Sequence, residues 1–97
     1  MLELIADQGS IPASAPLRAH PWRDPARWWP RLTAATAHLP APVAVIDLEA
    51  LRYNAMDMVV RAGGLPIRVA TKSVRVREVI DAALRVPGYR GLLAFTL

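Results

Sequence analysis

Lys72 is the residue of this sequence best suited to covalent chemistry. It is the only lysine among twelve basic residues, and the other eleven are arginines. A guanidinium stays protonated in a protein, whereas a lysine amine can lose its proton and attack a carbonyl. A lysine needed only for its charge could have been an arginine. Lys72 is therefore the first candidate for catalysis, and the alternative is an ordinary surface lysine at the end of a strand.

The elements around Lys72 follow from the spacing of apolar residues. Continuous apolar or β-branched runs predict strands, and apolar residues three or four apart predict helices. Asp24-Pro25 has the form of a helix start, and Gly63-Gly64 has the form of a helix end. We expect strands near 43–46, 67–71 and 92–96, and helices near 25–38, 48–62 and 74–85.

This alternation of strands and helices predicts an α/β fold with a parallel sheet. Lys72 would follow the strand 67–71 at its carboxyl end. The last strand would have no further element to cover its apolar edge, which natural proteins avoid. We therefore expect the front of a larger fold, with about three strands present, and a chain that is partly folded or prone to aggregate by itself.

Several short segments carry a family resemblance. They are Ala41-Pro42, then Asp47-Leu48-Glu49-Ala50-Leu51 with Asn54, then Ile67-Arg68-Val69-Ala70-Thr71-Lys72, and finally the run from Gly91 to Leu97. In this order they resemble the N-terminal barrel region of the fold type III pyridoxal-phosphate enzymes, the region shared with alanine racemase. Within that group they are most similar to D-threonine aldolase and the D-serine dehydratase-like amino acid deaminases.

The resemblance implies an incomplete (β/α)8 barrel that binds pyridoxal 5'-phosphate. It also implies that Lys72 forms the internal aldimine and that Arg68 contacts the cofactor. The reaction type stays open, because the aldolase motif has proline and histidine where this chain has Val69 and Ala70. A divalent metal used by that branch would be held by residues outside this chain, and the substrate would be a small amino acid. Asp47 and Asn54 are expected to be structural.

The composition excludes several classes of function. There is no cysteine, and neither histidine has a partner at metal-ligand spacing, so disulfides and a metal site are not expected. The formal net charge of +4 comes from scattered arginines, which does not favour nucleic-acid binding. No secretory signal is apparent and no window approaches the roughly 20 apolar residues of a membrane span. We expect a cytoplasmic protein without membrane or nucleic-acid partners.

The sequence divides into two regions. Residues 1–40 are expected to be an N-terminal extension with a tryptophan-rich helix, and residues 41–97 the start of the barrel. The high apolar content, 54% of the residues, favours association with the remainder of the barrel or with a homodimer partner. Two functions stay open. One is the front of a pyridoxal-phosphate-dependent lyase or aldolase, and the other is a truncated non-catalytic chain or small binding domain.

Overall fold

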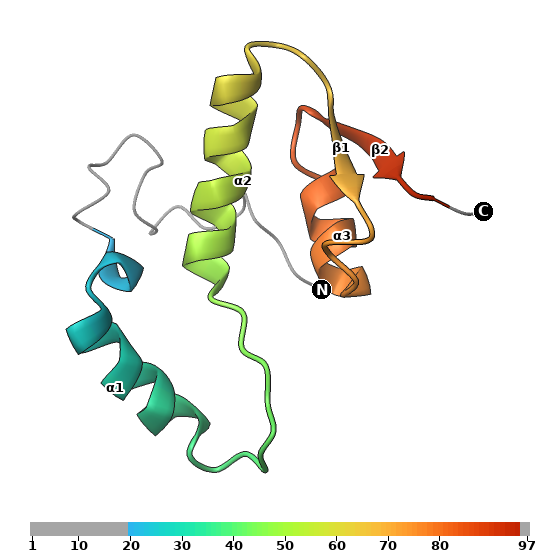
Figure 1. The fold of residues 1–97 in the computed structure, drawn as a ribbon. Helices are drawn as coiled ribbons and strands as arrows, with labels where there is room; N and C mark the ends of the chain where they lie inside the picture. The colour runs from blue at the N-terminus through green and yellow to red at the C-terminus, as the bar shows by residue number, and fades with distance from the viewer. Residues whose placement is uncertain (1–19, 96–97) are drawn as a thin grey trace.

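The computed structural model describes residues 20–95. A short 3-10 helix, η2 (Pro21–Arg23), precedes helices α1 (Pro25–Thr36) and α2 (Leu48–Ala62). Strand β1 (Ile67–Ala70), helix α3 (Arg77–Leu84) and strand β2 (Tyr89–Leu93) follow. The arrangement is mixed α/β, as the sequence predicts, and α2, β1, α3 and β2 form the main body in Figure 1.

Helix α2 has the bounds that the sequence predicts, because both of its ends are specified by local chemistry. The Asp47 carboxylate accepts a hydrogen bond from the amide of Ala50 over 3.0 Å, which satisfies one of the free N–H groups of the first turn. At the other end Gly63 adopts a left-handed conformation with φ of 59°. The structural role expected for Asp47 is therefore confirmed.

Strands β1 and β2 pair in parallel as a two-stranded sheet, with α3 as the crossover between them. Ile67 pairs with Tyr89, but Val69 pairs with Leu92, so β2 holds one extra residue between the two pairs. Gly91 lies in this bulge with φ of 85°, a backbone conformation that residues other than glycine rarely adopt.

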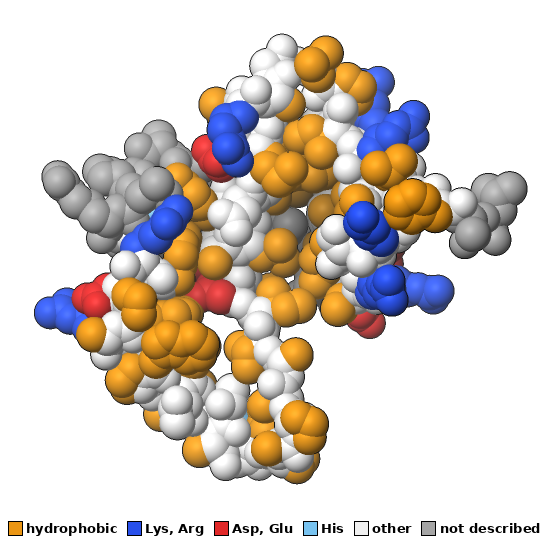
Figure 2. Space-filling view, in the orientation of Figure 1, with side chains coloured by type: hydrophobic (Ala, Val, Ile, Leu, Met, Phe, Trp, Pro, Cys, Tyr) orange, Lys and Arg blue, Asp and Glu red, His pale blue; other side chains and the backbone are white. Residues whose placement is uncertain are grey.

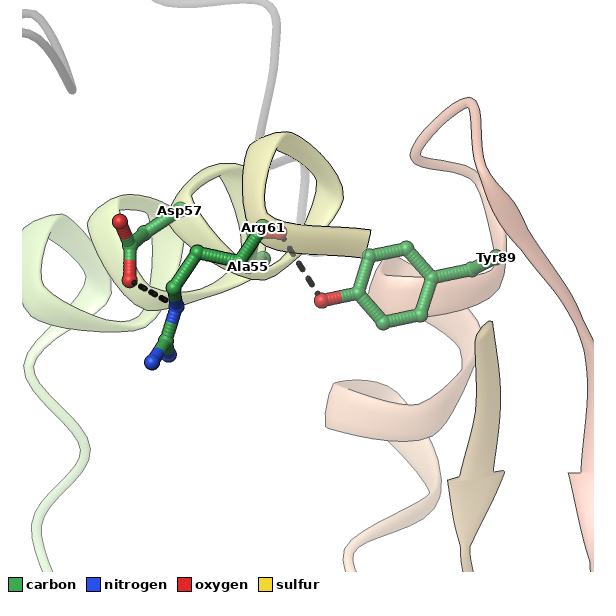
Figure 3. Close-up of polar contacts among 4 residues, drawn as sticks. All are labelled: Ala55, Asp57, Arg61 and Tyr89. Carbon is green, nitrogen blue, oxygen red and sulfur yellow. Dashed lines mark hydrogen bonds and ion pairs between the residues drawn. The ribbon is translucent and has the colours of Figure 1, made fainter. Parts of the chain in front are cut away.

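The small core lies where α2 and α3 meet the sheet. Its buried members are Ala55, Val69, Ala82, Ala83, Val86 and Tyr89. The Tyr89 hydroxyl donates a hydrogen bond to the carbonyl of Ala55 over 2.9 Å, which joins the start of β2 to the middle of α2 (Figure 3). Burial raises the pKa of the Tyr89 phenol above its ordinary value of 10.0, because the ionised form loses its hydration.

Residues 43–46 do not form the strand expected from their β-branched sequence. They lie extended between α1 and α2 without strand pairing, and Val43, Val45 and Ile46 are each more than two-fifths exposed. Figure 1 shows this segment leading from α1 to the start of α2, away from the sheet. The backbone N–H and C=O groups of a strand need hydrogen-bond partners on a neighbouring strand, and no described strand lies beside this segment.

Other boundaries differ from the predicted ones. Helix α1 ends at Thr36 rather than 38, and β1 ends at Ala70 rather than 71. Helix α3 begins at Arg77 rather than 74, because residues 71–73 form a turn, and Val76 is its N-cap residue. The last strand is Tyr89–Leu93 rather than 92–96.

The N-terminal region of the described chain contacts α2 through aromatic rings. His20 is 1% exposed and stacks on Trp22, with ring centroids 4.7 Å apart. Its other neighbour is Tyr53 of α2, at 4.5 Å. Trp22 therefore packs within this region, whereas Trp29 on α1 is 65% exposed. The expected extension over residues 1–19 lies outside the described residues.

Candidate functional site

Lys72 lies in the turn of residues 71–73 that follows the carboxyl end of β1. The turn is closed by hydrogen bonds from the amides of Ser73 and Val74 to the carbonyl of Ala70, both 3.1 Å long. The Lys72 side chain is exposed, and its Nζ lies 5.5 Å from the centre of the Phe95 ring. The described residues thus leave the Lys72 amine accessible rather than buried.

Arg68 lies on β1, four residues before Lys72, and is also exposed. Its guanidinium crosses to the neighbouring strand: Nη1 lies 3.1 Å from the position that a Cβ on Gly91 would occupy. The glycine in the bulge therefore leaves room for this side chain. Arg68 is the second residue of β1 and contacts β2, whereas Lys72 follows the carboxyl end of β1 and contacts Phe95.

Arg75 is a third cation at the same place. Its Nε donates a hydrogen bond to the main-chain carbonyl of Lys72 over 3.3 Å, which holds the guanidinium beside the turn. None of the carboxylates that the structure describes forms an ion pair with Arg68, Lys72 or Arg75. Figure 2 shows Lys and Arg side chains on the side of the molecule that carries the sheet and also on the opposite side.

The local charge of this segment is strongly positive. Residues 67–77 include Arg68, Lys72, Arg75 and Arg77 and no acidic residue, so they carry +4 in eleven positions, as much as the net charge of the whole chain. Unscreened positive charge raises the local concentration of anions. This end of β1 is therefore suited to an anionic ligand.

A half-open apolar cavity of about 260 Å³ adjoins the same strand. It lies between α2, β1 and α3, and all four residues of β1 line it together with Ser73 and Tyr89. Lys72 lies outside this lining. The cavity therefore brings Arg68, but not the lysine, to an apolar wall, and the described residues do not enclose the Lys72 amine.

The two residues that the sequence singled out are thus placed within and just after one strand, Arg68 as the second residue of β1 and Lys72 in the turn that follows it. Sequence reasoning missed Arg75 and Phe95 as their neighbours. The signal for Arg75 was present, because four cations without an acid in eleven positions can be read directly from the sequence. The contact with Phe95 depends on the register in which β1 and β2 pair, which the sequence pattern does not specify.

Comparisons with models of protein families, with curated proteins and with solved structures found no match to this chain. Among the described residues, no group of three or more His, Cys, Asp or Glu side chains is arranged to hold a metal ion. Within the same residues, none of the helices combines the length and apolar character that crossing a lipid bilayer requires.

Proposed function

We propose that residues 41–97 form the front of a pyridoxal-phosphate-dependent enzyme of the fold type III group, an amino acid lyase or aldolase. The observation that supports this most is the place of the only lysine, in the turn that follows the carboxyl end of a parallel strand. Catalytic groups of (β/α)8 barrels lie at such strand ends. The proposal includes the fold itself, an incomplete barrel of which β1 and β2 are two strands.

The residues present fit the cofactor as an attachment point. The Lys72 amine is exposed, and no described carboxylate pairs with it. The surrounding cations suit an aldehyde that carries a phosphate group. Lys72 would hold the cofactor covalently, and Arg68 would contribute positive charge beside it. When bound, pyridoxal phosphate supplies an electron sink for negative charge that develops at the substrate's Cα.

Lys72 then has a second task in the proposed reaction. With the cofactor and the substrate bound, the Lys72 amine would be a base close to the substrate's Cα, where it would accept or return a proton. Arginine could not do this, because its guanidinium stays protonated. The substrate would be a small amino acid, and the cofactor would be bound tightly only with contacts from beyond these residues.

The attachment of the cofactor to Lys72 can be tested because this chain has few primary amines. Apart from the α-amino group, Lys72 is its only primary amine. In the intact protein, pyridoxal phosphate should give a visible absorbance band, and reduction with borohydride should add its mass to the peptide that contains Lys72. Lys72→Arg should abolish both signals while preserving the charge. The 97-residue chain alone should bind the cofactor only weakly.

Two outcomes would argue against the proposal. A band that persists in Lys72→Arg would place the attachment elsewhere. If Lys72 of the intact protein reacts with pyridoxal phosphate no faster than a free lysine derivative does, the alternative is favoured, which is a non-catalytic chain or small binding domain. The observation behind that alternative is the exposure of the Lys72 amine, which the described residues do not enclose.

A further inference from the structure

We infer that residues 43–46, the connecting segment between α1 and α2, add as a further strand to the free edge of β1 in a second copy of this chain. Two copies would thereby exchange their connecting segments and form a dimer. This contact is independent of the proposed cofactor. Within the described residues, one chain holds both complementary parts, an extended apolar segment without strand pairing and a strand with one unpaired edge.

Strand β1 has an edge to which another strand can add. The amides of Ile67 and Thr71 donate hydrogen bonds of 2.9 and 3.1 Å to main-chain carbonyls on the β2 side. Backbone groups alternate in direction along a strand, so the amides of Arg68 and Ala70 face away from β2. The described strands form a sheet of two strands only, so none of them pairs with this second edge. Unpaired N–H and C=O groups along a strand are a template for another strand.

The free edge of β1 adjoins an apolar cavity, which determines the kind of strand that fits there. The half-open cavity of about 260 Å³ lies between α2, β1 and α3, and all four residues of β1 line it. Leu51 and Met58 of α2 and Val79 of α3 add apolar side chains to its wall. A strand that pairs with this edge would place the side chains of one of its faces against this wall. Burial of apolar surface therefore favours an apolar strand as the partner.

The connecting segment has the length and composition that this edge requires. It consists of Val43, Ala44, Val45 and Ile46, which match the four residues of β1 in number and are all exposed. Val43 and Val45 line a groove together with α1. Because side chains alternate along an extended segment, Ala44 and Ile46 point the other way, where they are available to the cavity of a second copy.

The position of the connecting segment favours a second copy over the segment's own chain. Figure 1 shows α1 and the connecting segment projecting beyond the start of α2, apart from the sheet. Within α1, all of which the structure describes, none of the residues is buried. Each copy supplies one segment and accepts one, so the exchange is reciprocal and gives a closed two-fold dimer rather than an open chain of copies.

Chemical crosslinking of the full chain tests this contact, because the sequence has no cysteine of its own. Val45→Cys and Ala70→Cys chains are unfolded together, refolded and treated with a short bismaleimide, whose span covers opposite and diagonal positions of neighbouring strands. Each chain has one thiol, so every crosslink joins two copies. Products that join Val45→Cys to Ala70→Cys should exceed by about 10-fold those that join Val45→Cys to Val60→Cys, because only the first pair is held together. Val60 is the matched control, a valine of α2 that is 74% exposed.

Sedimentation velocity gives an independent measurement of the same contact. Val45→Lys should raise the dissociation constant of the dimer about 10-fold or more, because burial of the valine is lost, and Val60→Lys should leave it unchanged. Three results would overturn the inference: a wild-type chain that stays monomeric, crosslinking that is no stronger at position 70 than at position 60, or a chain with both Val45→Cys and Ala70→Cys that crosslinks within itself. The last result would show that the segment returns to β1 of its own chain.

Discussion

Removing the Tyr89 hydroxyl tests how β2 is joined to α2. Tyr89→Phe keeps the buried ring but loses the hydrogen bond of 2.9 Å to the carbonyl of Ala55 (Figure 3). That carbonyl lies inside α2 and keeps its helical partner, so no buried group is left without a hydrogen bond. The free energy of unfolding should therefore fall by about 1 kcal/mol, which corresponds to a loss of about 4–8 °C in Tm for a domain of this size.

The same hydroxyl predicts a dependence on alkaline pH. Burial raises the pKa of Tyr89 in the folded chain above its ordinary value of 10.0, so the folded state favours the protonated phenol. The stabilisation is complete below pH 10.0 and is lost as the pH rises through the folded pKa, because the unfolded chain releases this proton first. In Tyr89→Phe this loss disappears, so the difference in stability between the variant and the wild type should shrink as the pH rises above 10.0.

The assay is thermal unfolding followed by far-ultraviolet circular dichroism in dilute solution, at neutral and alkaline pH. Tyr53→Phe is the matched control, since no hydrogen bond within the described residues uses the Tyr53 hydroxyl. It should leave both the neutral Tm and the alkaline decline nearly unchanged. Equal effects of the two substitutions, or a Tyr89→Phe chain that declines with pH as the wild type does, would refute the reasoning.

Three further predictions concern backbone, cap and surface. Gly88→Ala should lower the free energy of unfolding, measured by urea titration, by about 2 kcal/mol or more, and by more than Gly63→Ala does. The added Cβ at position 88 would lie 3.2 Å from Val59, whereas a Cβ at position 63 would meet open space. Equal effects of the two substitutions would contradict this. Asp47→Ala should lower the free energy of unfolding by about 1 kcal/mol in the same titrations. Asp47→Asn should lower it much less, because asparagine keeps a side-chain oxygen that can accept the hydrogen bond from Ala50. Leu93→Lys should reduce concentration-dependent association in sedimentation velocity, since Leu93 is 60% exposed on an edge strand; unchanged association would locate the contact elsewhere.

The parts of the fold that the sequence predicts well are those specified by neighbouring residues. Helix α2 has the predicted bounds because Asp47 and Gly63 determine its two ends. The sequence cannot show whether a strand finds a partner, and residues 43–46 have strand composition without pairing. The β2 boundary was misplaced because Gly91 resembles the start of a strand, whereas it occupies a bulge inside one.

The candidate site shows the same division. The single lysine and its place after a strand can be read from the sequence, and the structure places it there. Its exposure could not be read in this way, because the burial of a side chain depends on elements distant in the chain. The contact of Arg68 with Gly91 was also hidden, since it depends on the register of two strands more than twenty positions apart.

The bulge at Gly91 also bears on how this chain can tolerate changes in length. Deleting that one residue would leave Tyr89 opposite Ile67 and Leu92 opposite Val69, now in an uninterrupted ladder. Deleting Arg90 would keep the same two pairings, whereas deleting Leu92 would change the residue opposite Val69. The bulge, residues 90–91, is thus the part of β2 where the chain can lose one residue without exchanging the inner and outer faces of the strand, and loss of Gly91 would also remove the space that Arg68 occupies.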